Sequence, residues 1–136
     1  MIVVDAPLVA FLLIEGEGTP VARRLYKADP EWVTPPILNH ELLNILGGLG
    51  HAEGDFASME ALWKEARGIL APRQQVPDPV RALRLSVELG LSGYEAQYLA
   101  LAEKLALPLL TTEKRLLALR GGRCVTPEHY LEGVGS

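Results

Sequence analysis

The chain contains little cysteine and no long apolar run. Its 136 residues include one cysteine, Cys124, so an internal disulfide cannot form and no second cysteine completes a zinc site. No segment approaches the roughly 18 consecutive apolar residues that span a bilayer. The start of the chain contains Asp5 and lacks the basic region of a secretory signal. We therefore expect neither secretion nor membrane insertion, and the reducing cytoplasm is the predicted location.

Three kinds of catalytic motif are also missing from the sequence. His40, His51 and His129 have no paired His or Cys at zinc-ligand spacing, and we predict that they lie at the surface. No glycine-rich phosphate loop follows a predicted strand, and there is no G-x-S-x-G nucleophile elbow. Nucleotide-triphosphate hydrolysis and serine-hydrolase chemistry therefore lose support.

What is present is the composition of a globular protein, with 49% hydrophobic and 22% charged residues. The length predicts one domain over residues 1–136. The net charge of −4 provides no global attraction for nucleic acid, although it does not exclude a local site. Lys114, Arg115, Arg120 and Arg123 are close together in the sequence, and a solvated helix face is the favoured explanation.

Apolar strands and amphipathic helices alternate along the chain, which predicts an α/β fold. We expect a parallel sheet of about five strands with helices on both faces. The predicted strands are residues 2–4, 32–34, 74–76, 109–111 and 123–125. The predicted helices are residues 8–14, 21–27, 35–49, 56–70, 79–89, 92–105 and 114–119, with a short one after the last strand. Thr34 is the predicted cap of the third helix, and the glycines from Gly47 to Gly54 are predicted to loosen the connection that follows it.

Two carboxylates follow predicted strands. Asp5 ends the first strand, and Glu113 follows the strand that ends at Thr111. Ligands of an open parallel sheet gather beyond the carboxyl ends of its strands, so both acids belong at that edge. A simpler explanation stays open for each, since Asp5 also suits a helix cap and Glu113 a first helical turn.

Two further carboxylates lie on the inner faces of predicted helices. Glu41 falls within the apolar stripe of its helix, where an ionised carboxylate needs a cation, a metal or several hydrogen bonds. Asn44, one turn later, is placed to share its polar pocket. Glu95 also faces inward, but Ser92 to Glu95 forms a capping box that explains Glu95 without any ligand.

The four acids together predict a metal site. Asp5, Glu41, Glu95 and Glu113 would repel one another unless a cation lay between them, and hard ions such as Mg²⁺ or Mn²⁺ prefer such an all-oxygen cluster. We include Asn44, Ser92 and Thr111 as supporting residues. Such a site suits phosphodiester hydrolysis.

Three blocks of sequence resemble a known family. They are DAPLVAFLL at the start, PPILNHELLNIL in the middle and LSGYEAQYLALAEKLALPLLTTEKRLL near the end. Together they resemble a PIN domain of the VapC toxin type, and the last block is the most specific. The resemblance implies a Mg²⁺- or Mn²⁺-dependent endoribonuclease that is paired with a small antitoxin and is often a homodimer.

The resemblance also assigns roles by position, with two departures. Asp5 and Glu41 match the first two metal-site acids of the family. Glu95 and Glu113 stand where the family has Asp, and Pro7 replaces a small hydroxyl residue. Each Asp-to-Glu change lengthens the side chain by roughly 1 to 1.5 Å, more than the roughly 0.5 Å that a catalytic constellation tolerates. A PIN-like domain that binds RNA or a partner through a weakened nuclease site is therefore the alternative function.

Two further expectations complete the predictions. Phe56, Met59, Leu62 and Trp63 lie on one predicted helix, where core packing is the favoured role; an apolar groove there would suit a partner helix. A receiver-like signalling domain also fits the size and the α/β pattern. The residues from Gln74 to Pro77 offer no phosphoacceptor Asp, so we rank it below both PIN-like alternatives.

Overall fold

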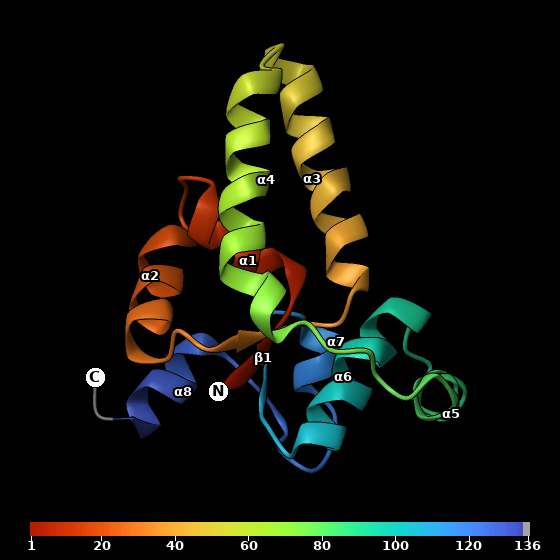
Figure 1. The fold of residues 1–136 in the computed structure, drawn as a ribbon. Coiled ribbons are helices and arrows are strands. Elements are labelled where there is room, and N and C mark those ends of the chain that lie inside the picture. The colour runs from red at the N-terminus through yellow and green to blue at the C-terminus, as the bar shows by residue number, and fades with distance from the viewer. Residues whose placement is uncertain (135–136) are drawn as a thin grey trace.

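A small parallel sheet lies at the centre of a mostly helical chain in the computed structural model, which describes residues 1–134 (Figure 1). Its strands are β1 (Ile2–Val4), β2 (Trp32–Val33), β3 (Leu109–Leu110) and β4 (Cys124–Val125). They pair in the order β2-β1-β3-β4, all in parallel. Val3 is aligned with Val33 on one side and with Leu109 on the other. The predicted α/β fold with a parallel sheet is confirmed.

Helices surround this sheet and make up most of the chain. They are α1 (Ala6–Leu13), α2 (Thr19–Ala28), α3 (Ile37–Glu53), α4 (Phe56–Leu70), the short 3₁₀ helix η1 (Ala71–Arg73), α5 (Pro79–Leu89), α6 (Gly93–Leu105), α7 (Lys114–Leu117) and α8 (Pro127–Gly133). Helices α3 and α4 form a long hairpin that projects away from the sheet (Figure 1). No helix in residues 1–134 combines the length and the apolar character needed to cross a bilayer.

The direction of the strand connections explains why the sheet is buried. The chain passes from β1 to β2 through α1 and α2, and then returns past β1 to β3 through the helices from α3 to α6. Right-handed crossovers in opposite directions place their helices on opposite faces of a sheet. Two helices of the second connection contact the sheet directly, α6 against β1 and α4 against β2. The residues of β1, β2 and β3 are accordingly fully buried.

The predicted strand at residues 74–76 is absent from the sheet. Only the amide of Gln75 makes a strand-like contact, donating to the carbonyl of Thr34 at 3.1 Å. Pro77 and Pro79 follow and have no N–H groups to extend a ladder. The side chain of Gln74 instead joins a polar cluster, in which it accepts from Arg67 at 2.8 Å and donates to Asn39 at 2.8 Å.

Two predictions about α3 are also wrong. Thr34 does not cap it: α3 begins at Ile37, and the fully buried Thr34 hydroxyl accepts from Gln74 at 3.2 Å. Gly47, Gly48 and Gly50 do not loosen the connection either, because the helix runs through them to Glu53, and only Gly54, with φ 64°, lies in the connection. A β-carbon at Gly50 would lie 2.7 Å from Cγ of Met59 on α4. Gly50 is therefore needed for the close approach of α3 and α4.

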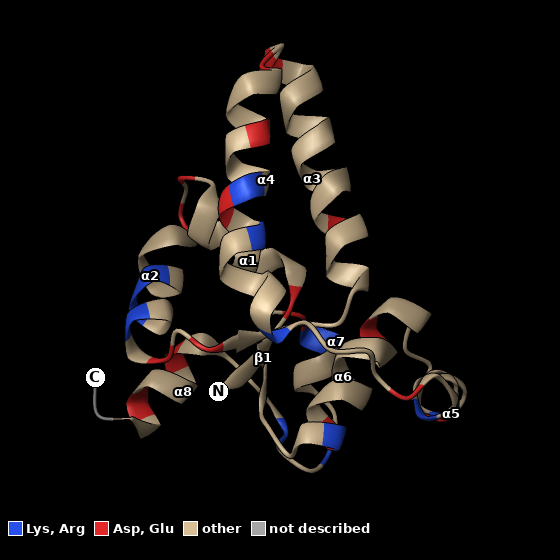
Figure 2. Ribbon diagram, viewed as in Figure 1, with Lys and Arg blue, Asp and Glu red and all other residues tan. Residues whose placement is uncertain are grey.

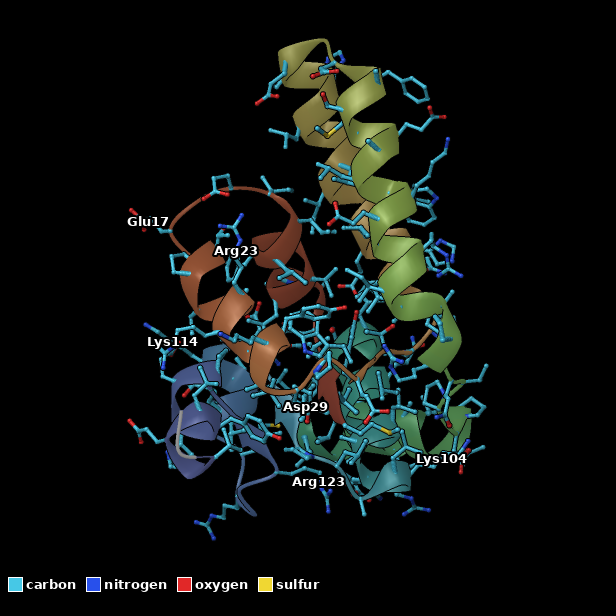
Figure 3. All side chains as sticks on the ribbon, turned by 60° about the vertical axis from the view of Figure 1, so that its left-hand side comes forward. Glu17, Arg23, Asp29, Lys104, Lys114 and Arg123 are labelled. Carbon is cyan, nitrogen blue, oxygen red and sulfur yellow. The ribbon has the colours of Figure 1, made fainter. Side chains whose placement is uncertain are left out.

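The two ends of the described chain meet at one carboxylate. Asp29, labelled in Figure 3, follows α2 and accepts from the ammonium group of Met1 at 2.8 Å. It also accepts from the hydroxyl of Tyr130 on α8 at 3.1 Å. Asp29 thus links α8 and the start of β1 to the end of α2.

Candidate functional site

A buried acid and a buried hydroxyl meet where the strand order reverses. Asp5 follows β1 and Thr111 follows β3, and these neighbouring strands lead to connections on opposite sides. Such a reversal opens a crevice beyond the carboxyl ends of the strands, which is the usual ligand site of an open parallel sheet. The hydroxyl of Thr111 donates to Oδ2 of Asp5 at 2.5 Å, and the amide of Leu8 donates to Oδ1 at 3.3 Å. Asp5 therefore caps α1 from a buried position at the end of β1.

The carboxyl of Asp5 is held in an environment that disfavours its charge. Burial leaves it 4% exposed and raises its pKa from 3.8 to about 6. The hydrogen bonds from Thr111 and Leu8 act in the opposite direction, and the negative charges of Glu113 and Glu41 raise the pKa further. Three of the four predicted acids therefore interact electrostatically at this point.

Glu41 is fixed by a residue that the sequence analysis did not select. The hydroxyl of Tyr98 on α6 donates to Oε1 of Glu41 on α3 at 2.6 Å. Tyr98 is 3% exposed, and its burial, together with the charge and the hydrogen bond of Glu41, raises the pKa of its hydroxyl. Tyr98 is thus a permanent neutral donor. A tyrosine in an otherwise apolar helix face was the available signal, because a buried hydroxyl needs a partner.

Glu113 lies at the solvent side of the same edge. It is exposed and precedes α7, where its side chain makes no capping hydrogen bond. Its amide donates to Oγ1 of Thr111 at 3.0 Å. The Thr111 hydroxyl therefore connects the backbone of Glu113 to the carboxylate of Asp5.

Glu95 is engaged at the start of its own helix. It accepts from the amide of Ser92 at 3.0 Å, while the Ser92 hydroxyl accepts from the amide of Glu95 at 3.0 Å. The predicted capping box is present. The carboxylate also lies 3.7 Å from Nη1 of Arg115 on α7, with its side chain 20% exposed. The partners of the Glu95 carboxylate are thus Ser92 and Arg115 and not the other three acids.

A cleft of about 660 Å³ opens beside Glu41. Asn44 lies in its wall, one turn after Glu41. The other lining residues are Ala6, Pro7, Ile37, His40, Ile45 and Tyr94. The cleft is thus formed by the start of α1, by α3 and by Tyr94 of α6, and Glu41 is the acid that lines it.

The acids offer suitable donor atoms for a divalent ion but do not form a complete coordination site. Oxygen is the only donor type of Asp5, Glu41 and Glu113, which fits Mg²⁺ or Mn²⁺ in its chemistry. No three His, Cys, Asp or Glu side chains of residues 1–134 stand close enough together to hold a metal ion. The unneutralised charges around Asp5 would be relieved by a cation.

The histidines and the single cysteine remain to be placed. His40, His51 and His129 are all exposed, as predicted. Cys124 is partly buried against the core, and burial raises the pKa of its thiol to about 11. A neutral thiol of this kind is a packing residue and not a nucleophile.

Two solved structures have a fold similar to that of this chain. One is the crystal structure of PAE2754 from Pyrobaculum aerophilum, with a TM-score of 0.77 and 23% identity, covering 98% of this chain and 93% of that one. The other is a toxin-antitoxin complex from Klebsiella pneumoniae, with a TM-score of 0.65 and 20% identity, covering 93% of this chain and 98% of that one. This chain shares their fold. No family model matches the sequence, and no curated protein matches it.

Proposed function

We propose that this chain is a metal-dependent endoribonuclease of the PIN/VapC toxin type. The observation that carries the proposal is Asp5, buried at the reversal of the strand order with Thr111 bonded to it and the charges of Glu41 and Glu113 acting on it. Sequence resemblance and the shared fold with a toxin-antitoxin complex point in the same direction.

The residues of the site have separate tasks in this proposal. Asp5, Glu41 and Glu113 would hold Mg²⁺ or Mn²⁺, and when bound such an ion supplies Lewis acidity toward phosphate oxygens. Thr111 orients Asp5, and Tyr98 orients Glu41. These hydrogen bonds fix the carboxylates before a substrate arrives, which lowers the cost of ordering them.

Cleavage of RNA with and without metal tests the enzymatic claim. We expect single-stranded RNA to be cut in Mn²⁺ or Mg²⁺ and to be left intact in EDTA. Asp5→Asn should abolish cutting. Glu65→Gln, at an exposed position of α4, removes one negative charge elsewhere and should cut as the wild type does. RNA that stays intact in both metals, or equal cutting by Asp5→Asn, would reject the enzyme.

The second candidate function is RNA or partner binding through a weakened nuclease site. It is favoured by Glu95, which is held by Ser92 and Arg115 at a position where the resemblance expects a metal-site Asp. The double variant Glu95→Asp, Glu113→Asp distinguishes an active nuclease from a weakened one. A large gain in cleavage would mean that the native site is degenerate, whereas an unchanged or lower rate supports the native enzyme.

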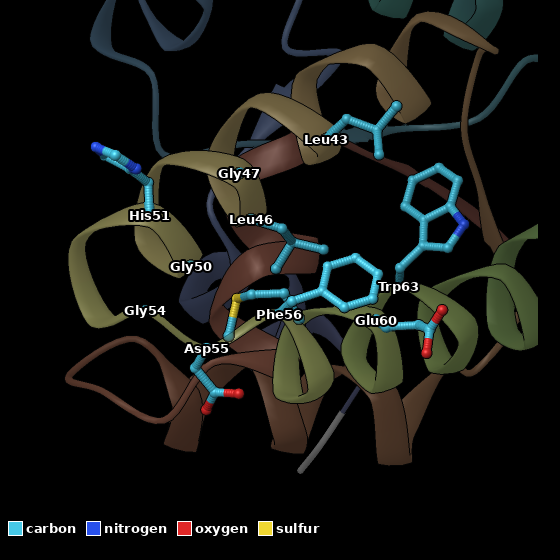
Figure 4. Close-up of a pocket in the computed structure, with 11 residues that line it drawn as sticks. Leu43, Leu46, Gly47, Gly50, His51, Gly54, Asp55, Phe56, Glu60 and Trp63 are labelled. Carbon is cyan, nitrogen blue, oxygen red and sulfur yellow. The ribbon is translucent and has the colours of Figure 1, made fainter.

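An apolar groove on the α3–α4 hairpin supports an antitoxin-like partner. The groove has a volume of about 590 Å³ and is open between the two helices (Figure 4). Phe56 and Leu43 are 75% and 52% exposed in it, and Trp63 forms part of its wall. Helix α3 carries few charges (Figure 2), while Asp55 and Glu60 line the groove. An amphipathic partner helix with basic flanks fits this surface.

Substitution of the groove tests this partner surface. A candidate antitoxin should bind the wild-type chain and suppress its cleavage of RNA. Phe56→Asp should weaken that binding while RNA cleavage without the partner stays unchanged. Ala61→Asp, at another exposed position of α4, is the matched control. Equal binding by Phe56→Asp and the wild type would place the partner elsewhere.

A second apolar surface supports a homodimer. Val80, Leu83 and Val87 of α5 are 68%, 65% and 76% exposed, and their spacing puts them on one face of the helix. Val76, 66% exposed, precedes this face, and a hollow of about 540 Å³ lies beside it. A stable interface buries roughly 800 Å² per partner, more than these four side chains supply. A two-fold pair in which each copy fills the hollow of the other would meet that need.

Light scattering after size-exclusion chromatography tests the homodimer. We expect the wild type to elute as a dimer at micromolar concentration. Leu83→Glu with Val87→Glu should give a folded monomer, and Ala61→Glu should stay dimeric. A monomeric wild type would remove this proposal, as would a dimer that survives the double substitution.

A further inference from the structure

Two tyrosines of α6 flank Glu41 in different ways. Tyr94 and Tyr98 are four residues apart, so they lie on the same face of the helix. Tyr98 is buried and binds the Glu41 carboxylate. Tyr94 lies one turn nearer the start of α6, is 59% exposed, and lines the cleft that Glu41 also lines. The core therefore does not account for Tyr94.

The cleft and the carboxylate site share one residue, Glu41. Ala6 and Pro7, the first residues of α1 after Asp5, form another part of the cleft lining. A phosphate held through the acids would therefore have this cleft as its immediate neighbour. The volume of about 660 Å³ is ample for one flat heteroaromatic ring and its sugar.

The chemistry of the cleft lining suits a nucleobase. Tyr94 offers an exposed aromatic ring, and unpaired bases stack on such rings. The exposed side chains of Asn44 and His40 carry hydrogen-bonding groups that match the polar edge of a base. Ile37 and Ile45 supply an apolar floor. The bases of a duplex are stacked on each other, so only a single strand can present one here.

We propose that this cleft seats one base of single-stranded RNA, next to the phosphate held at the carboxylates, with Tyr94 as the stacking surface. The inference rests on the proposed nuclease function and adds to it a base-contact site. Because the chain has a net charge of −4, general attraction for the backbone is weak. Stacking in this cleft should then account for a large share of RNA affinity.

Binding of short single-stranded RNA to variants of the full chain tests the seat. Fluorescence anisotropy is measured on the Asp5→Asn background without added metal, so that the RNA stays intact and every variant is compared with the same parent. Tyr94→Ala should weaken binding about tenfold, and Tyr94→Phe, which keeps the ring, should bind as the parent does. Leu89→Ala removes an exposed apolar side chain at the end of α5 that is not part of the cleft lining, and it should have no effect.

An RNA that carries abasic sites in place of its bases provides the second arm. The parent should lose about as much affinity for this RNA as Tyr94→Ala loses for normal RNA. Tyr94→Ala should lose nothing further on the abasic RNA, because the base and the ring act as one pair. If the abasic RNA and Tyr94→Ala each reduce affinity and the two reductions add, the base does not stack on Tyr94.

The outcomes separate this inference from the nuclease proposal. If the wild type cuts RNA only with metal and Tyr94→Ala binds RNA as tightly as its parent, the base-binding cleft is rejected and the nuclease proposal is kept. Binding that depends on Tyr94 without any cutting would support the seat and reject the enzyme. If the wild type neither binds nor cuts RNA, both are overturned.

Discussion

The hydroxyl of Tyr98 donates a hydrogen bond to Oε1 of Glu41 at 2.6 Å, joining α6 to α3 across 57 residues of sequence. The donor is 3% exposed, whereas Glu41 retains some contact with solvent. The buried end of this pair fixes the position of the carboxylate that borders the cleft. Tyr98 is thus a positioning residue for the candidate site.

Replacing Tyr98 by Phe should cost stability and loosen Glu41. A hydrogen bond to a charged group is worth about 1.5–3 kcal/mol, and the partial exposure of Glu41 lets water replace some of it. We expect the free energy of unfolding in urea to fall by about 1–2 kcal/mol. Calorimetry should also show weaker Mn²⁺ binding. An unchanged Mn²⁺ affinity would show that Tyr98 only supports the fold.

Asp5 should make folding stability depend on pH. Its pKa is about 6 in the folded chain and 3.8 in the unfolded reference, so the folded state holds the proton more tightly. The protonated Asp5 carboxyl contributes its full stabilisation of the folded state below about pH 4. This contribution falls as the pH rises toward 6 and is lost above that value. At pH 7.5 the wild type therefore carries a penalty of about 3 kcal/mol.

Asp5→Asn removes this penalty and should be the more stable protein at neutral pH. We expect a gain of about 1–3 kcal/mol at pH 7.5 that shrinks toward pH 4, measured by urea denaturation across this range. Asp78→Asn, at an exposed helix cap, serves as the control and should show no such gain. A constant difference between Asp5→Asn and wild type at every pH would contradict the prediction.

A divalent cation should make the wild type more stable than Asp5→Asn. Binding to the folded state alone stabilises it in proportion to the logarithm of ligand concentration. Mn²⁺ at pH 7.5 should therefore raise the melting temperature of the wild type and leave that of Asp5→Asn nearly unchanged. Equal shifts in both proteins would indicate that the ion binds away from Asp5.

Gly18 should tolerate no side chain because of its contact with Phe11. A β-carbon there would lie 2.5–2.8 Å from three atoms of the Phe11 ring, so the ring must move. We expect Gly18→Ala to lower the free energy of unfolding by about 1–3 kcal/mol. Gly16→Ala is the matched control, since its β-carbon would meet nothing nearer than 4.0 Å. Similar losses in both would point to loop entropy as the cause.

The capping box should stabilise the start of α6. Ser92→Ala removes the acceptor for the amide of Glu95, which should cost about 1 kcal/mol in thermal denaturation. Ser92→Thr keeps the hydroxyl and should cost much less. If both substitutions cost the same, the ion pair of Glu95 with Arg115 and not the cap holds this end of the helix.

The order of elements could be predicted from the sequence because each depends on local patterns. Helix α5 runs from Pro79 to Leu89 and ends at Gly90 with φ 69°, as the Pro and Gly signals indicated. The missing strand at residues 74–76 was a failure of the same method. Gln74 is extended, with φ −70° and ψ 131°, but its side chain joins a polar cluster assembled from distant residues.

Glycines in α3 show a second limit of local reasoning. Gly47, Gly48 and Gly50 favour a break by propensity alone. The helix continues because Leu42 and Leu46 are buried and Gly50 lets Met59 approach closely. Tertiary packing outweighs a propensity cost of about 1 kcal/mol per glycine.

The sequence by itself determined the α/β class, the position of Asp5 at the end of the first strand and the capping box of Glu95. These depend on apolar periodicity and on contacts within a few residues. Only the tertiary structure decided that Thr111 and Tyr98 hold Asp5 and Glu41 and that Glu95 is paired with Arg115. Such contacts join segments far apart in the chain, and the spacing of residues along it does not encode the distances between folded elements.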